Sequence, residues 1–563
     1  MAELTPMMQK YMETKEQYKD CILFYRLGDF YEMFFDDALV ASKELEITLT
    51  GKSCGLEERA PMCGIPYHAV EGYLTKLVSR GYKVAICEQV EDPKLAKGLV
   101  KREVTRVVTP GTNLNVQSLE AGKNNYLLSI AYTSDGIGIS AADVTTGDYY
   151  VTEVEDLKKL NDELMKYEPS EIICNEAFLV SGFDVNDLKS RLHISVNALE
   201  SHMFDDDGCR RILMKHFKVN TLIGLGVEEF PTGLLAAGAL LQYLYDTQKT
   251  DLEHFTHIYP YLTSKYMLLD SSTRRNLELT ETLREKQKRG SLLWVLDKTK
   301  TAMGARLLRN YIEQPLIEKD EMEKRLDAIQ ELNQDSISRD EIREYLNPIY
   351  DLERLLSKVT YKTANPRDLI AFRNSLQMLP PIKTVLSAFE KEELVEIREQ
   401  IDGLEDIYQL IDEAIIEEPP ISIREGGMIK DGFDETIDRL RSAKHDGKQW
   451  LAQLEEEDRE RTGIKNLKIK YNKVFGYYFE VTNSYKDLVP EDYIRKQTLA
   501  NAERYTTPRL KELEDTILNA EDKLQTLEYD VFCRIRDTIA QELVRIQNTA
   551  KAIAKLDVYA SLS

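Results

Sequence analysis

The chain has 563 residues and a formal net charge of −23 at pH 7. This length provides material for several domains, and the charge excludes a protein whose whole surface binds nucleic acid, so any contact with DNA must be local. The seven cysteines form no CxxC pair, which argues against a structural zinc site or a disulfide framework and predicts a reducing compartment.

Positive charge gathers in two segments of this acidic chain. Residues 76–106 carry eight Lys and Arg against four Asp and Glu, and residues 465–511 carry ten against five. No apolar run approaches the length of a membrane span, and no apolar segment follows basic residues at the N-terminus. The sequence therefore predicts a cytoplasmic protein with no membrane partner.

Residues 1–116 have the pattern of a mixed α/β domain. We expect a strand over 21–27, an interruption at Gly28, and Asp29 as the cap of a helix that reaches Leu45. Further along, the pattern predicts a helix over 67–80 and short strands at 47–50, 82–88 and 100–108.

The sequence Gly28-Asp29-Phe30-Tyr31-Glu32 allows two interpretations. In the first, Asp29 and Glu32 form a helix capping box and Phe30 packs in the core. In the second, Phe30 enters a DNA minor groove as a wedge and stacks on an unstacked base, at a cost of a few kcal/mol for kinking the duplex. Glu32 would then bond the edge of a mispaired base and repel the phosphates of a matched duplex.

Residues 117–250 begin with alternating apolar positions and tight turns. This pattern predicts strands over 126–133, 136–142 and 148–154, followed by alternating helices and strands. Asp143 and Asp148 flank the second turn, where acidic residues are usually turn formers. We expect no catalytic constellation among them, although a metal nuclease over residues 126–245 is one class of function to be tested.

The remainder is predicted to be mainly helical, beginning with an almost wholly helical stretch from about residue 265 to 445. Trp294 is expected in the core, and helical sequence resumes at about Ala500. Residues 509–563 contain neither Gly nor Pro. An unbroken helix over 503–553 would span about 75 Å.

A small β insertion over residues 441–500 interrupts these helices, with strands expected over 466–471 and 476–482. The alternative is a solvated charged surface. Basic side chains in the insertion can make contacts with DNA phosphates that are independent of sequence. The candidates are Lys468, Lys470, Lys473, Arg495 and Lys496.

The order of several motifs resembles the MutS family of mismatch-recognition proteins, and the likeness extends to residue 563. It is carried by the Gly28 to Glu32 motif and by four later blocks: Pro61-Met62-Cys63-Gly64-Ile65-Pro66-Tyr67-His68-Ala69, Ala85-Ile86-Cys87-Glu88-Gln89, Arg106-Val107-Val108-Thr109-Pro110-Gly111-Thr112, and Asp270-Ser271-Ser272-Thr273-Arg274-Arg275-Asn276-Leu277.

The resemblance implies a multidomain α/β plus mainly α fold. Its domains would be a mixed α/β mismatch-recognition domain (1–116), a ribonuclease H-like α/β connector (117–250), a long-helix core and lever domain (251–440 and 501–563) and an inserted β-rich clamp (441–500). It also implies that Phe30 and Glu32 read the mismatch, and that Asn472 and Asn501 touch DNA phosphates beside the basic residues of the clamp.

The resemblance further implies partners and cofactors. The partners would be double-stranded DNA with mismatches or small insertion or deletion loops, and a MutL-type protein bound through the connector. The full-length protein would be a homodimer and a DNA-dependent ATPase. No G-x-x-x-x-G-K-[ST] sequence exists in this chain, so we expect a truncated chain that is not an enzyme. ATP and magnesium are expected only with the missing ATPase domain.

Three classes of function are compatible with the sequence: a mismatch-sensing DNA-binding module, a helical scaffold or lever without mismatch-specific DNA binding, and the metal nuclease. We expect the first. The motif at Phe30 and the two basic segments together favour the DNA-binding module. The acidic total charge and the long helices, taken alone, would also suit a scaffold.

Overall fold

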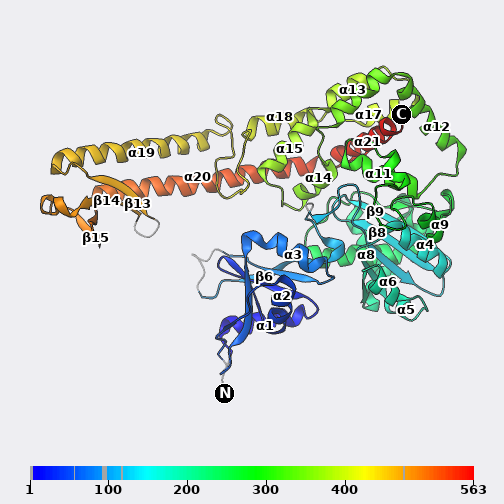
Figure 1. The fold of residues 1–563 in the computed structure, drawn as a ribbon, viewed down its shortest axis with the longest axis horizontal. Helices are drawn as coiled ribbons and strands as arrows, with labels where there is room; N and C mark the ends of the chain where they lie inside the picture. Colours follow the sequence, from blue (N-terminus) through cyan, green and yellow to red (C-terminus); the bar gives the residue numbers. More distant parts are fainter. Residues whose placement is uncertain (1–3, 56, 92–97, 116–117, 473–475) are drawn as a thin grey trace. The chain divides into compact units, whose positions relative to one another are not determined.

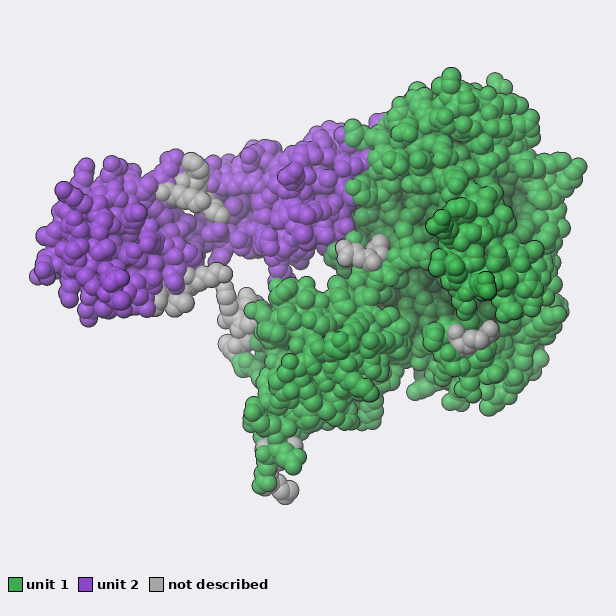
Figure 2. All heavy atoms as spheres, viewed as in Figure 1, with its two compact units in different colours: residues 1–363, 375–403, 542–563 green, residues 364–374, 404–541 purple. Residues whose placement is uncertain are grey.

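The computed structural model describes residues 4–55, 57–91, 98–115, 118–472 and 476–563. The chain divides into two compact units (Figure 2). Unit 1 comprises residues 1–363, 375–403 and 542–563, and unit 2 comprises residues 364–374 and 404–541. Among the described residues, every helix is too short or too polar to traverse a lipid bilayer.

A six-stranded sheet occupies the N-terminal region of unit 1 (Figure 1), in the order β3-β4-β2-β1-β5-β6. Its strands are β1 (Ile22–Leu27), β2 (Phe30–Phe34), β3 (Thr50–Lys52), β4 (Ala60–Pro66), β5 (Val84–Gln89) and β6 (Arg102–Val108). The helices are α1 (Pro6–Gln17), α2 (Phe35–Leu45) and α3 (Val70–Val78). Because side chains alternate between the faces, Tyr31 and Met33 pack with α2 and α3, whereas Phe34 packs with α1.

A second six-stranded sheet follows, in the order β11-β10-β7-β8-β9-β12. Its strands are β7 (Leu127–Tyr132), β8 (Ile137–Asp143), β9 (Asp148–Val154), β10 (Glu171–Asn175), β11 (Ser195–Leu199) and β12 (Tyr259–Pro260). Helices cover both faces: α4 (Leu157–Tyr167), α5 (Glu176–Leu179) and α6 (Val185–Arg191) on one, and α7 (Asp206–Phe217) and α8 (Pro231–Gln248) on the other. The three strands predicted before residue 155 are confirmed.

The rest of unit 1 is helical. Its helices are α9 (Ser271–Asn276), α10 (Leu292–Leu296), α11 (Ala302–Glu313), α12 (Lys319–Gln334), α13 (Ser336–Leu346), α14 (Leu352–Thr360), α16 (Leu379–Leu386), α17 (Glu392–Gln400) and α21 (Leu543–Leu562). The last helix lies beside α11, where its buried Asp557 accepts hydrogen bonds from the backbone N–H groups of Lys300 at 2.9 Å and Thr301 at 2.7 Å. Two segments about 250 residues apart in sequence are therefore fixed together at the start of α11.

Arg306 on α11 forms a buried ionic cluster with the start of α14. Its guanidinium lies 2.7 Å from Asp351 Oδ2 and 2.6 Å from Glu353 Oε2, and it also donates to the Ala121 carbonyl at 2.9 Å. The Arg306 side chain is only 3% exposed. This cluster connects α11, α14 and the segment before the second sheet.

Unit 2 consists of an antiparallel helix pair, α19 (Glu435–Thr462) and α20 (Pro508–Gln541), together with a four-stranded sheet, α18 (Glu405–Ala414) and most of α15 (Pro366–Leu376) (Figure 1). The strands are β13 (Lys468–Asn472), β14 (Gly476–Thr482), β15 (Ile494–Thr498) and β16 (Ala502–Thr506), in the order β13-β14-β16-β15. Leu454, Phe479 and Leu510 join the two helices and the sheet in one core.

The structure corrects four predictions. The strand expected at 47–50 lies at Thr50–Lys52, and Trp294 is 46% exposed rather than in the core, because its neighbour Leu293 takes the buried position of the short helix α10. Helical sequence does not resume at Ala500, because two further strands extend the four-stranded sheet of unit 2 to Thr506. The C-terminal helix is not continuous from 503 to 553: it begins at Pro508 and is interrupted at Glu542 between α20 and α21.

Candidate nucleic-acid interface

The motif around Phe30 forms a β-hairpin. Leu27 of β1 pairs with Phe30 of β2, which leaves Gly28 and Asp29 as a two-residue turn. Gly28 has a φ of +59°, a left-handed conformation that glycine adopts without steric cost. The prediction that Asp29 caps a helix is wrong: α2 begins only at Phe35, after Phe34 as its N-cap. The capping-box interpretation of Asp29 and Glu32 therefore fails.

Phe30 is a surface residue. Its side chain is 46% exposed, whereas its neighbour Tyr31 is 4% exposed and belongs to the core. Alternation along β2 explains the difference, because Phe30 and Glu32 share one face while Tyr31 and Met33 take the other. The interpretation of Phe30 as a core residue is thus wrong.

Glu32 forms an ion pair that sequence reasoning missed. Its Oε2 lies 2.5 Å from Nζ of Lys52 on β3, and the carboxylate side chain is 16% exposed. β4 lies between β2 and β3 in the sheet, and its Gly64 stands opposite Glu32. Because glycine has no side chain, nothing at this position blocks the approach of Lys52 to Glu32. Nothing in the sequence spacing connects Lys52 with Glu32, which lies 20 residues before it.

Arg26 and Tyr67 support the hairpin turn. The guanidinium of Arg26 lies 3.7 Å from the centroid of the Tyr67 ring and donates from Nε to the Gly28 carbonyl, while Tyr67 N–H donates to the Asp29 carbonyl at 3.0 Å. Tyr67 is 42% exposed. Tyr67 belongs to the sequence block at residues 61–69. That block could have drawn attention to Tyr67, but its pattern predicts no role for this residue.

Tyr31 anchors the other face of the hairpin. Burial raises the pKa of Tyr31, and its hydrogen bond to the Glu88 carboxylate raises that pKa further. The hydroxyl therefore remains a proton donor to Glu88, which also lies 3.8 Å from Arg26. These contacts fix β2, so Phe30 projects from a rigid strand rather than from a loop.

The four-stranded sheet of unit 2 brings two of the predicted basic residues to one face. Lys468 and Lys470 alternate on β13 with Ile469, which packs against the core of the helix pair, so both lysines lie on the face opposite that core. Lys470 Nζ is 2.7 Å from the Glu480 carboxylate, and this ion pair offsets one of the two positive charges. Lys473 lies outside the described residues.

Arg495 and Lys496 lie on the edge strand β15, where the register shifts between Arg495 and Gln497. Both are exposed. Arg495 is 3.6 Å from Glu503, and the hydrogen bond from the Tyr505 hydroxyl lowers the pKa of that carboxyl, so Glu503 keeps its negative charge. Lys496 stands at the bulge.

Asn472 ends β13, where it pairs with Gly476, and Asn501 lies exposed between β15 and β16. The carbonyl of Asn501 accepts a hydrogen bond from Asn483 N–H at 3.2 Å. The two asparagines thus end or follow strands of one sheet. Their predicted contacts with phosphate remain predictions.

Asp143 and Asp148 are turn formers, as predicted. Asp143 accepts from Thr145 N–H at 2.8 Å and from Asn125 N–H at 3.0 Å, and Asp148 accepts from the Thr146 hydroxyl at 2.8 Å. No group of three or more His, Cys, Asp or Glu able to hold a metal ion lies in the described ranges.

Three sequence models of protein families match the chain. They are described as MutS domain I over residues 5–117, MutS domain II over 125–256 and MutS domain III over 272–563.

Curated relatives match over the whole length of the chain. A DNA mismatch repair protein MutS from Lachnoclostridium phytofermentans is 67% identical over 563 residues, which is 60% of that protein. Proteins of the same name from Ruminiclostridium cellulolyticum and Acetivibrio thermocellus are 54% and 53% identical, with 64% and 65% of their lengths covered. The chain spans less than two thirds of the length of these relatives.

Proposed function

The chain belongs to the MutS family, and on this premise we propose that it recognises mispaired bases in double-stranded DNA. In this proposal the Phe30 hairpin reads the mismatch and the clamp sheet of unit 2 holds the DNA backbone. The domain boundaries proposed from sequence are kept, with the clamp sheet extended to Thr506. The relatives are DNA mismatch repair proteins, which supports a role in mismatch repair.

The observation that carries the proposal is the exposed Phe30 side chain at a two-residue turn. An aromatic ring displayed on a rigid hairpin can enter the minor groove and separate stacked bases, which kinks the duplex. A mispaired base is already weakly stacked and paired, so its displacement costs less than that of a matched base. The difference between these costs gives selectivity.

Glu32 stands beside the wedge on the same face of β2. When Phe30 is inserted, the Glu32 carboxylate reaches the edge of the displaced base and can accept a hydrogen bond from it. At a matched pair no base edge is free, and the carboxylate meets only phosphates of like charge. Glu32 therefore attracts mismatched DNA and repels matched DNA.

Fluorescence anisotropy titrations with duplexes that differ by one mispair, at two salt concentrations and with or without magnesium, test the proposal. We expect tighter binding to the mismatched duplex. An absence of DNA binding would instead favour the helical scaffold, and cleavage in magnesium would favour the nuclease.

Replacing Glu32 with glutamine is expected to tighten binding to matched duplex and to narrow the ratio of mismatched to matched affinity. The change keeps the shape of the side chain, removes the charge that repels phosphates, and releases the Lys52 ammonium group from its ion pair, so that it can attract them. Glu103→Gln is the matched control, because Glu103 also pairs with one lysine, Lys101 at 2.6 Å, on the same sheet. A matched-duplex affinity that stays constant or falls in Glu32→Gln would remove Glu32 from the reading site.

Replacing Lys468, Arg495 and Lys496 together with glutamine is expected to weaken binding to matched and mismatched duplexes by a similar factor. Contacts with phosphate carry no base information, and each one lost should flatten the log-log salt dependence by about one unit. Lys523→Gln, at an exposed position on α20, is the control. A salt dependence that the triple variant leaves unchanged would contradict the clamp assignment.

We further propose, from the family resemblance, that a MutL-type protein binds the connector and that the longer protein is a homodimer in the cytoplasm. ATP and magnesium would act through a further ATPase domain of that longer protein. None of the residues discussed in this chain has a role in ATP hydrolysis under this proposal.

A further inference from the structure

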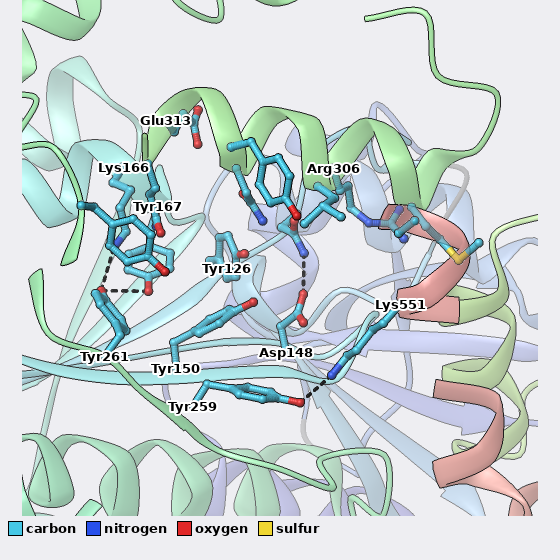
Figure 3. A pocket seen from close by; sticks show the side chains of 18 of the residues that line it. Tyr126, Asp148, Tyr150, Lys166, Tyr167, Tyr259, Tyr261, Arg306, Glu313 and Lys551 are labelled. Atoms are coloured by element: carbon cyan, nitrogen blue, oxygen red, sulfur yellow. Dashed lines mark hydrogen bonds between the residues drawn. The ribbon is translucent and has the colours of Figure 1, made fainter. Parts of the chain in front are cut away.

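A cavity of about 470 Å³ opens within unit 1 between the second sheet and the helices α11 and α21 (Figure 3). The second sheet contributes Asp148 and Tyr150 from β9 and Tyr259 from β12, and the helices contribute Arg306 and Lys551. Its volume lies within the range of small-molecule binding sites, roughly 300 to 1,000 Å³. It shares no residue with the Phe30 hairpin.

Tyrosine rings form one side of this cavity. Tyr150 lies at the centre of the group, with its ring centroid 5.9 Å from that of Tyr259, 6.3 Å from that of Tyr167 and 6.5 Å from that of Tyr126. The rings are tilted or edge-on to one another, as Figure 3 shows. A surface of several aromatic rings suits a planar, unsaturated ring, because bases stack on aromatic side chains whatever their sequence.

The charges around the cavity favour an anion. Lys166 and Arg306 have carboxylate partners, Glu163 at 2.5 Å and Asp351 at 2.7 Å. Within the described residues of the chain, four further lining cations form no ion pair with a carboxylate: Lys265, Arg325, Lys551 and Lys555. Lys551 and Lys555 lie one turn apart on the same side of α21, and Lys551 Nζ donates to the Tyr259 hydroxyl at 2.6 Å.

The lining carboxyl groups offset this positive charge incompletely. They are Asp148, Glu313 and Glu353, and the last of these already pairs with Arg306 at 2.6 Å. Burial raises the pKa of Glu313 to about 7 and also raises the pKa values of Asp148 and Glu353. Removal from water disfavours their charged forms, so they contribute less than three full negative charges at neutral pH. The unpaired charge of the cavity is therefore positive.

We propose that this cavity binds a nucleoside monophosphate, with its base on the tyrosine surface around Tyr150 and its phosphate at Lys551 and Lys555. Recognition rests on side chains of β9, β12 and α21, so it needs no glycine-rich phosphate loop. The assignment goes beyond mismatch reading and is independent of it.

Isothermal titration calorimetry of the full chain with deoxyadenosine monophosphate tests the assignment. We expect saturable binding that is tighter than the binding of inorganic phosphate, and none of spermidine. The double variant Lys551→Gln/Lys555→Gln should weaken binding of the mononucleotide at least about tenfold, because it removes charge-assisted hydrogen bonds. Tyr150→Leu should reduce the preference for the mononucleotide over inorganic phosphate.

Lys158→Gln on the exposed surface of α4 is the control and should bind like the wild type. Equal affinities in the wild type and the double variant, tighter binding of spermidine, or binding of a single-stranded oligonucleotide without binding of the mononucleotide would each overturn the assignment. None of these outcomes bears on the Phe30 hairpin, whose own test is discrimination between matched and mismatched duplexes.

Discussion

Replacing Phe30 with alanine is expected to abolish the preference for mismatched over matched duplex while leaving the fold intact. The ring is 46% exposed, so truncation removes little buried area, whereas a core phenylalanine would cost about 3 to 5 kcal/mol of unfolding free energy. Without the ring, nothing separates the stacked bases, and both duplexes are held only through their backbones. Competition titrations with one matched and one mismatched duplex measure the preference directly.

Leu39→Ala is the matched control for this variant. Leu39 is 48% exposed on α2, in the same domain, so its truncation removes a similar exposed apolar surface away from the hairpin. It should retain the wild-type preference. A Phe30→Ala variant that still discriminates mismatches, with a melting temperature close to that of the wild type, would show that the wedge lies elsewhere.

Replacing Arg306 with alanine is expected to lower the free energy of unfolding by about 3 to 5 kcal/mol, the range found when one partner of a buried ion pair is removed. The loss arises because Glu353 would remain in a buried site without its cation, and Asp351 would keep only the more distant Arg354, at 3.8 Å. Urea unfolding followed by circular dichroism measures the difference. A variant that cannot be obtained in folded form agrees with this expectation.

The Arg210→Ala variant tests whether burial, and not the number of carboxylate partners, determines the loss of unfolding free energy. Arg210 also pairs with two carboxylates, Asp206 and Glu228, each at 2.8 Å, but its side chain is 29% exposed and lies at the surface. Water can solvate those partners after the change, so we expect a loss of about 1 kcal/mol or less. Similar losses for the two variants would mean that the Arg306 cluster is not effectively buried.

Much of the fold follows from local pattern. The strands β7, β8 and β9 were predictable because apolar residues alternate between tight turns, and α11 because Thr301 offers an N-cap and Pro315 ends the helical segment. The interruption at Glu542 was not predictable, since the residues around it continue the apolar spacing of the helix and include neither Gly nor Pro.

The candidate site was only partly predictable. Phe30 and Glu32 could be selected from their motif, but the motif also fits a capping box, and only the hairpin pairing places both residues on one face of β2. Lys52 reaches the hairpin from β3, and Tyr67 reaches it from the turn that follows β4. Sheet pairing thus brings together residues about 20 to 40 positions apart. Such contacts depend on register and leave no signal in local spacing.

Under the proposed function, the ion pair between Lys52 and Glu32 would set a threshold for the reading step. A displaced base must compete with an ammonium group 2.5 Å away before it can engage the carboxylate, so recognition is an exchange of partners and not a simple gain of one. A partly exposed pair of this kind is worth about 1 kcal/mol or less, which corresponds to at most about a fivefold change in an equilibrium constant. Under this proposal, a brief opening of a matched pair would not displace Lys52 from Glu32. A base edge that is held open would displace it readily.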